Sequence, residues 1–110
     1  MLVFSPCLEI FFGSLPFIER MKAISSLGYT HYEFWSWWDK DLNVIAEKNE
    51  ELGLTTQAFC TRFISLVDPT LQNAYLEGLA ETIEVARKLK ARIIISQVGN
   101  ELSGIPRSRQ

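Results

Sequence analysis

One pattern occurs three times in this chain and restricts its possible folds more than any other feature. In each copy a helix-like segment ends in leucine, a short turn follows, and a run of β-forming residues comes next. Glycine follows the leucine in the first two copies, where it allows the left-handed conformation that ends many helices. Lys90 takes this place in the third copy, so that turn is either costlier or built differently. The copies span residues 27–34, 52–59 and 89–96.

The segments before these turns have apolar residues at helical spacing. In the first helix Ser14 is the expected N-cap, and Pro16 lies in the first turn, where its missing N–H does no harm. The second helix is expected to begin near Asp39 or Asp41, and the third at Asp68, with Pro69 following. The expected buried stripes are Phe17, Met21, Ile24 and Leu27; Leu42, Ile45, Ala46, Asn49 and Leu52; and Leu71, Tyr75, Leu79, Ile83, Ala86 and Leu89.

A further strand is expected at residues 2–8, which makes the order β-α-β-α-β-α-β. Strands separated by single helices pair in parallel through right-handed crossovers, so the fold class is α/β. The apolar run of residues 93–95, three isoleucines, is typical of a strand buried on both faces.

Two architectures share this order, an open doubly wound sheet and a (β/α)8 barrel. The nucleotide-binding open sheet needs a glycine-rich turn after its first strand, and residues 7–14 contain one glycine and three bulky apolar residues in a row. We therefore expect a partial TIM (β/α)8 barrel of about four parallel strands with three helices. A complete barrel takes roughly 250 residues, and this chain has 110.

Charge and cysteine content exclude several functional classes. The chain has 11 Lys and Arg against 13 Asp and Glu, so it lacks the basic excess that nucleic acid and anionic membranes select. Its two cysteines are too few for a disulfide framework or a zinc motif. No apolar run approaches the roughly 20 residues of a membrane span. Pro6, Glu9 and the lack of a basic start argue against a signal peptide, so we expect a cytoplasmic protein.

Ligands of both architectures bind at the carboxyl ends of the parallel strands. His31, Tyr29 and Thr30 lie at the opposite end, so we interpret them as structural. Glu33 is either an exposed or lysine-paired carboxylate, or an acceptor for substrate hydroxyls or an outer partner of a metal ligand. The other polar and aromatic residues expected at this end are Cys7, Glu9, Trp35, Trp37, Trp38, Cys60, Thr61, Arg62, Ser96, Gln97, Asn100 and Glu101.

Those residues do not assemble into recognisable catalytic machinery. The sequence offers no metal-ligand cluster, nucleophile triad or close carboxylate pair. Cys60 is more typical of a small buried apolar residue than of a nucleophile, because no histidine is available to activate it. The three tryptophans at 35, 37 and 38 cannot all enter one core, so we expect a hydrophobic wall, a partner contact or a sugar-stacking face.

Residues 15–20 read Leu-Pro-Phe-Ile-Glu-Arg, residues 32–35 read Tyr-Glu-Phe-Trp, and residues 36–42 form a Trp-Trp-Asp loop. Together with Ile-Ser-Gln-Val-Gly at 95–99, these segments resemble the hydroxypyruvate isomerase family of xylose-isomerase-like (β/α)8 sugar isomerases and epimerases. The match is to the first half of that family and covers nearly all of this chain.

The resemblance implies a metal-dependent isomerisation or epimerisation of a small hydroxy-carbonyl compound or sugar. A divalent metal, Mg or Mn, polarises the substrate oxygens while a carboxylate moves a proton between carbons. The family's metal ligands and catalytic glutamates lie on later strands, so no catalytic or metal-binding residue is carried over. The resemblance does imply that Glu33, Trp35, Cys60 and Gln97 line the substrate pocket.

Residues 1–110 are therefore expected to be the N-terminal half of such a barrel, inactive in isolation. One alternative is a non-catalytic half-barrel that associates with a partner or with itself, because an opened barrel exposes an edge at residues 93–95 and its apolar interior. A homo-oligomer is thus one expected state. Another alternative is an open-sheet module that binds a small ligand.

Overall fold

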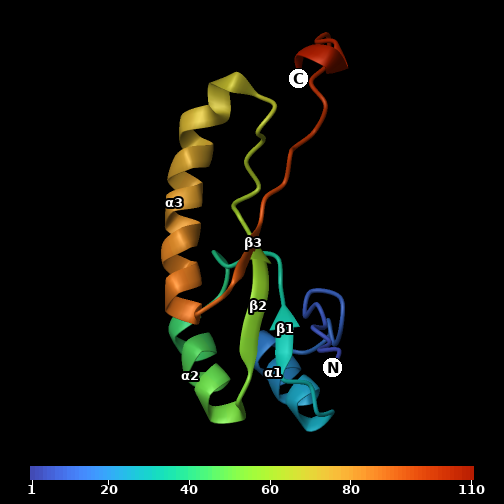
Figure 1. Cartoon of the computed structure of the whole chain (residues 1–110), viewed down its shortest axis with the longest axis vertical. Coiled ribbons are helices and arrows are strands. Elements are labelled where there is room, and N and C mark those ends of the chain that lie inside the picture. The colour runs from blue at the N-terminus through green and yellow to red at the C-terminus, as the bar shows by residue number, and fades with distance from the viewer.

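The computed structural model describes all 110 residues, and its strands form one parallel sheet. Strands β1 (His31–Glu33), β2 (Thr55–Cys60) and β3 (Ile93–Ile95) lie side by side in that order (Figure 1). Helix α1 (Phe17–Ser26) precedes β1, α2 (Leu42–Leu52) joins β1 to β2, and α3 (Gln72–Leu89) joins β2 to β3. The expected α/β class, with parallel strands and helical connections, is confirmed. Two short 3-10 turns are η1 (Pro69–Leu71) and η2 (Arg107–Arg109).

The N-terminal segment pairs with the outer side of β1 over a shorter length than expected. Cys7 forms an isolated parallel bridge with Glu33. The Leu8 amide donates to the Glu33 carbonyl at 2.8 Å, and the Glu33 amide donates to the Pro6 carbonyl at 3.0 Å. Residues 1–4 are exposed and form no strand. Because β1 is only three residues long, it offers a partner to the end of the expected strand at 2–8 and not to its beginning.

Two of the three expected helix starts are confirmed. The Asp41 carboxylate caps α2 by accepting from the amides of Asn43 and Val44 at 3.1 and 3.2 Å. Asp68 likewise caps η1, which leads directly into α3, and Pro69 is the first residue of that turn.

The prediction that Ser14 caps α1 is wrong. Pro16 occupies the cap position and no side chain bonds to the helix start, because Ser14 lies two residues too far upstream. The loop before α1 is instead fixed by the Arg20 guanidinium. It donates to the carbonyls of Leu8, Gly13 and Leu15 at 2.7, 3.1 and 2.7 Å.

Like α2, α3 ends at a residue in the left-handed conformation, although that residue is lysine and not glycine. Gly53 after α2 has φ +64°, and Lys90 after α3 has φ +56°. The Lys90 amide donates hydrogen bonds to the carbonyls of Ala86 and Arg87. Of the two alternatives for this turn, the structure has the costlier one, because Lys90 carries a β-carbon in a conformation that favours glycine.

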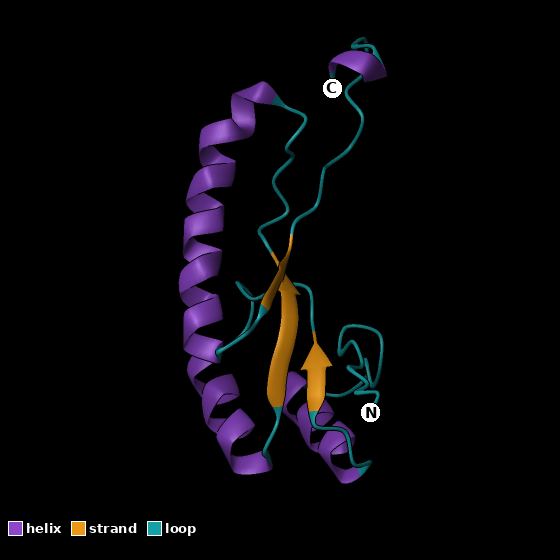
Figure 2. Ribbon diagram, in the orientation of Figure 1, coloured by secondary structure: helices purple, strands orange, loops and turns teal.

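All three helices lie on one face of the sheet, where they enclose a single core of 12 residues (Figure 2). Tyr32 of β1, Phe34 directly after β1, and Phe59 of β2 contribute completely buried rings. The rings of Phe34 and Phe59 are stacked with their centroids 5.4 Å apart. The helices contribute Met21, Ile24, Ile45, Val85, Ala86 and Leu89.

The expected stripes are correct for α2 and partly wrong elsewhere. Leu27 is exposed because the chain turns away from the sheet there. In the third stripe the expected Leu71, the last residue of η1, and Ile83 are exposed, and the buried residues of α3 are Gly78, Thr82, Val85, Ala86 and Leu89. A tertiary contact explains the rotated stripe: the indole N–H of Trp37 donates to the Thr82 hydroxyl at 3.2 Å and fixes which side of α3 faces inward.

The second face of the sheet carries no helix. Ile93 and Ile95 are 45% and 40% exposed on this face, while Ile94 is half-buried against the core. The expectation that residues 93–95 are buried on both faces is therefore wrong, because only one face has a covering layer. β3 is an edge strand, as expected for an opened barrel. The radius of gyration is 16.1 Å, above the roughly 13 Å of a compact domain of this length.

Candidate functional site

The candidate site lies on the uncovered face of the sheet, at the carboxyl ends of the strands. Along a strand, successive side chains point to opposite faces. Phe34 and Phe59 stack on the helix side, so Glu33 and Cys60 point to the other side. Cys7, Glu33 and Ala58 pair as one row across the sheet, and Cys60 pairs with Ile95 in the next.

An irregular register in the first pair of strands makes this arrangement possible. Tyr32 pairs with Thr56, but Glu33 pairs with Ala58, so β2 has one extra residue at this point. The bulge keeps both Thr56 and Phe59 on the helix face. There the Tyr32 hydroxyl bonds to the Asn49 amide oxygen at 2.9 Å and to the Thr56 hydroxyl at 2.8 Å.

Glu33 stands between two buried thiols. Burial raises the pKa of the Cys7 thiol, and the nearby carboxylates of Glu33 and Glu9 raise it further. Burial also raises the pKa of the Cys60 thiol, to which Cys7 and Glu33 add. Both thiols are therefore neutral at pH 7. This agrees with the interpretation of Cys60 as a small buried residue rather than a nucleophile.

Trp35 lies beside Cys60 and is 46% exposed. The Cys60 amide donates to the Trp35 carbonyl at 3.0 Å, and the Trp35 amide points to the Glu9 carboxylate at 3.4 Å. The structure thus brings Glu33, Trp35 and Cys60 together at the carboxyl ends of the strands. Gln97 is exposed in the loop after β3 and makes no hydrogen bond to these three.

A partly buried lysine that bonds to Glu9 was not predicted from the sequence. The Lys40 ammonium donates to the Glu9 carboxylate at 2.7 Å and to the Ser36 carbonyl at 2.7 Å. It also lies 5.0 and 5.3 Å from the ring centroids of Phe17 and Phe34, within cation–π range. The only local sign of it in the sequence was a single lysine in a loop rich in aromatic residues. Its partner Glu9 lies 31 residues away, which local patterns do not reveal.

The other two tryptophans, Trp37 and Trp38, lie between the loop after β1 and helix α3. Trp37 is buried, and Trp38 packs edge-on against both Trp37 and Phe63, with centroids 5.7 and 4.9 Å apart. The Arg62 guanidinium lies over the Trp37 ring at 4.6 Å and donates to Glu81 at 2.7 Å. Arg62 is therefore already paired, and these aromatic rings serve mainly as scaffold.

The loops after β2 and β3 run together beyond the strand ends. The Leu66 amide donates to the Val98 carbonyl at 2.9 Å. Gly99 has φ +106°, and a β-carbon there would lie 2.9 Å from the Ser65 Cα, so only glycine fits. These contacts hold the strand ends together, and the exposed Gln97 belongs to the same loop.

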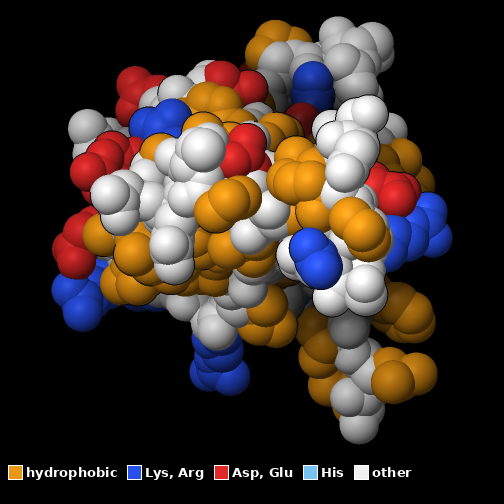
Figure 3. Space-filling model, turned by 90° about the horizontal axis from the view of Figure 1, so that it is seen from above, with side chains coloured by type: hydrophobic (Ala, Val, Ile, Leu, Met, Phe, Trp, Pro, Cys, Tyr) orange, Lys and Arg blue, Asp and Glu red, His pale blue; other side chains and the backbone are white.

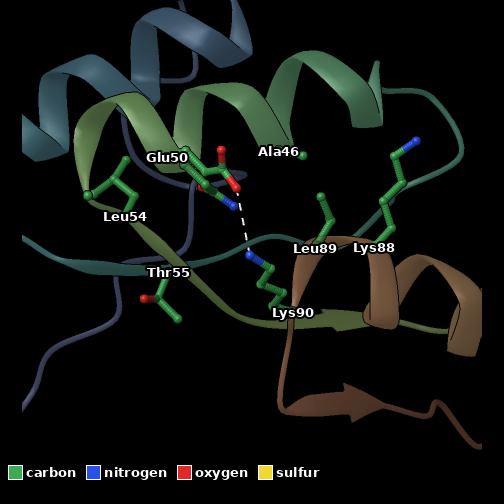
Figure 4. Close-up of a pocket in the computed structure, with 9 residues that line it drawn as sticks. Ala46, Glu50, Leu54, Thr55, Lys88, Leu89 and Lys90 are labelled. Atoms are coloured by element: carbon green, nitrogen blue, oxygen red, sulfur yellow. Dashed lines mark ion pairs between the residues drawn. The ribbon is translucent and has the colours of Figure 1, made fainter.

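The opposite end of the sheet has a different character. A hollow of about 350 Å³ lies between the ends of α2 and α3, lined by residues that include Glu50, Lys88 and Lys90 (Figure 4). Lys90 points to Glu50 at 3.7 Å. His31 also lies at this end, with its ring bonded to the Thr30 hydroxyl at 2.8 Å. Because substrates of both architectures bind at the other end, we treat this hollow as structural.

The chemistry open to the candidate site is that of a binding surface. No group of three or more His, Cys, Asp or Glu side chains comes together to hold a metal ion. The residues present therefore do not fit a metal centre by themselves. Seen from the carboxyl end of the strands, hydrophobic side chains occupy much of the surface, and Lys and Arg are scattered singly among them (Figure 3). None of the helices has the length and apolar character needed to cross a membrane.

Comparison with known proteins relates the chain to solved structures. No family model matches the sequence, and no curated protein matches it. An AP endonuclease, family 2, from Brucella melitensis superposes with a TM-score of 0.90 at 20% identity, over 99% of this chain and 45% of its own. A xylose isomerase-like TIM barrel/4-hydroxyphenylpyruvate dioxygenase fusion protein superposes with a TM-score of 0.68 at 14% identity, over 84% of this chain and 15% of its own.

The chain thus spans less than half the length of the solved proteins it matches. At these identities the likeness concerns the fold. The three parallel strands with helices on one face accordingly have the fold of part of a TIM barrel.

Proposed function

We propose that this chain forms one wall of the substrate pocket of a sugar isomerase or epimerase, acting on hydroxypyruvate or a related small hydroxy-carbonyl compound. The observation that supports the proposal is the placement of Glu33, Trp35 and Cys60 on the uncovered face, at the carboxyl ends of the strands. TIM-barrel enzymes bind their substrates at this end. The resemblance of residues 15–20, 32–42 and 95–99 to hydroxypyruvate isomerases supports the choice of substrate.

Each residue has a distinct role in this proposal. The Glu33 carboxylate accepts hydrogen bonds from substrate hydroxyls. The exposed Trp35 indole offers an apolar face to the C–H groups of the substrate. Cys60, neutral because burial raises its pKa, closes the wall behind them. Gln97 offers an amide from the loop at the mouth.

The proposal draws the catalytic groups from outside these residues. A divalent metal, Mg or Mn, supplies the polarisation of the substrate oxygens in this class of reaction. Its ligands and the proton-transferring carboxylate do not come from this chain, so the isolated chain binds substrate weakly and does not turn it over. We do not propose nucleic-acid binding, because phosphate contacts need clustered basic residues, and acidic residues outnumber basic ones here.

The test is a titration of the isotopically labelled chain with hydroxypyruvate and a panel of small ketoses, followed by NMR. We expect shifts at Glu33, at the Trp35 indole and at Cys60. Trp35→Ala and Glu33→Gln should weaken binding several-fold. Tyr29→Ala is the matched control, because Tyr29 is an exposed aromatic residue at the other end of the sheet.

Three outcomes would contradict the proposal. The first is a set of shifts confined to the hollow around Glu50 and Lys90, and the second is no shifts at millimolar ligand. The third is isomerase turnover by the isolated chain with Mg²⁺ or Mn²⁺, because that would place catalytic groups within it.

A further inference from the structure

The Glu33 carboxylate has no partner within the chain. It is half-buried on the uncovered face, and it forms no ion pair and accepts no hydrogen bond from another residue. Burial is the main reason why the pKa of the Cys60 thiol is raised, but the charges of Glu33 and Glu9 raise it too. The electrostatic potential beside Cys60 is therefore negative. This end of the uncovered face carries a negative charge that the chain does not neutralise.

The cations near the carboxyl ends of β1 and β2 already have partners. The Lys40 ammonium bonds to the Glu9 carboxylate at 2.7 Å, and the Arg20 guanidinium lies 4.0 Å from the same carboxylate. The Arg62 guanidinium donates to Glu81 at 2.7 Å. Proteins commonly bind the carboxylate or phosphate of a ligand with an arginine or lysine side chain. None of these three cations is free for that role.

Helix N-termini are the other common anion sites of a TIM barrel, and here they already carry carboxylates. The Asp41 carboxylate accepts from the first amides of α2. At the start of η1, the Asp68 carboxylate accepts from the Thr70 amide at 2.9 Å. The first turn of α1 has no side-chain cap, but it contains Glu19. An anionic ligand would therefore meet a negative side chain at each of these helix starts.

We infer that this wall takes the uncharged, hydroxyl-bearing part of its ligand, and that Glu33 selects against an anionic group there. The inference rests on the proposed function and adds the charge class of the ligand part that contacts Glu33. A substrate hydroxyl donates to a carboxylate, whereas a second carboxylate has no proton to donate and is repelled. An acid such as hydroxypyruvate would therefore lie with its hydroxymethyl end toward Glu33 and its carboxylate away from it.

A pair of ligands tests the inference in NMR titrations of the labelled chain at low ionic strength. Dihydroxyacetone shares the hydroxymethyl ketone of hydroxypyruvate and has a second hydroxymethyl group in place of the carboxylate. We expect dihydroxyacetone to shift the signals of Glu33 and Trp35 with a dissociation constant about five-fold lower or better, because two like charges repel at a half-buried site. Added salt should reduce this preference, since it screens the repulsion.

A charge-removing variant assigns the preference to one residue. Glu33→Gln keeps an acceptor oxygen but removes the charge, so it should weaken dihydroxyacetone binding more than hydroxypyruvate binding and bring the two dissociation constants close together. Glu47→Gln is the matched control, because Glu47 also lacks an ion pair but is exposed on α2, on the covered side of the sheet. The control should leave the ratio of the two dissociation constants unchanged.

The outcomes separate this inference from the proposed function. Hydroxypyruvate that binds at Glu33 and Trp35 as tightly as dihydroxyacetone would overturn the inference and leave the proposed function intact. A preference that is unchanged in Glu33→Gln, equally lost in Glu47→Gln, or insensitive to salt would overturn the inference as well. An absence of shifts at these residues with both ligands would overturn the proposed function itself, and the inference with it.

Discussion

The two faces of the sheet differ sharply, although the same short strands form both. On the helix side Tyr32, Phe34 and Phe59 are fully buried, and their rings contact one another. On the other side Trp35 and Ile95 remain about half exposed. Alternation along one strand thus divides neighbouring residues into those that hold the fold and those available for binding. Sequence neighbours such as Phe34 and Trp35 should respond very differently to the same substitution.

The largest expected effect comes from testing this pair directly. Phe34→Ala removes a ring that packs edge-on against Phe17 and stacks on Phe59, each at 5.4 Å. We expect it to lower the free energy of unfolding by about 3–5 kcal/mol, as large core truncations do. Trp35→Ala should lower it by less than about 1 kcal/mol, because an exposed side chain loses little on truncation. Urea denaturation measures both, and equal losses would mean that the uncovered face also stabilises the monomer.

The buried phenol on the helix face should make stability fall at alkaline pH. Burial raises the pKa of Tyr32 to about 12 from an ordinary value of 10.0. The folded chain therefore keeps this proton while the unfolded chain loses it, and stability declines as the pH rises from 10 toward 12. Over that range the loss approaches roughly 2–3 kcal/mol.

Comparison of two tyrosine variants isolates this effect. The raised pKa values of Cys7 and Cys60 add a decline that starts near pH 9, so the unsubstituted chain alone is not decisive. Tyr32→Phe should flatten the profile above pH 10, while Tyr29→Phe, at an exposed site, should leave it unchanged. Denaturation midpoints at each pH give the profiles, and identical profiles for the two variants would contradict the assignment.

Lys40 connects the two faces and should show an intermediate effect. Its ammonium lies beside the Phe34 ring on the covered side and bonds to Glu9, whose carboxylate reaches the Trp35 amide. Lys40→Met keeps the apolar stem but leaves Arg20, at 4.0 Å, as the one remaining cation beside the Glu9 carboxylate. We expect a loss of about 1–2 kcal/mol, because Glu9 is partly solvated.

The same variant should also loosen Trp35. Its indole fluorescence and amide exchange are the measurements, and Lys22→Met is the control, since Lys22 pairs with Glu19 on the surface. A Trp35 environment that stays unchanged in Lys40→Met would show that Glu9 does not position the loop.

Local features of the sequence predicted most of the fold. Asp41 and Asp68 cap helices through bonds to amides two or three residues away, and Gly53 acts at its own backbone angle. Such effects depend on near neighbours. The fold class followed from the alternation of these elements, and so did the position of Glu33 and Trp35 at the carboxyl ends of the strands.

Several of the failed predictions depended on contacts with other parts of the chain. Burial of Ile93 and Ile95 requires a second covering layer, which a strand's own composition does not specify. The inward side of α3 depends on the bond from Trp37 to Thr82, 45 residues away. The loop that Ser14 was expected to end is fixed by Arg20 instead. The sequence therefore predicted where the proposed pocket wall lies, but not the contacts that hold its residues in place.

The smallest expected effect concerns the turn that leads from the covered face into β3. Lys90 adopts the left-handed conformation that its two counterparts give to glycine, at a strain of about 1 kcal/mol. Lys90→Gly should therefore stabilise the chain by about 0.5–1 kcal/mol in thermal or urea unfolding, against a small loss of the exposed pair with Glu50. Lys90→Ala is the matched control, because it removes the same ammonium and keeps the β-carbon. A gain in both variants would assign the effect to charge, whereas a gain in Lys90→Gly alone assigns it to the backbone. In that second case, the chain is under backbone strain where it enters β3, the edge strand whose Ile93 and Ile95 are exposed.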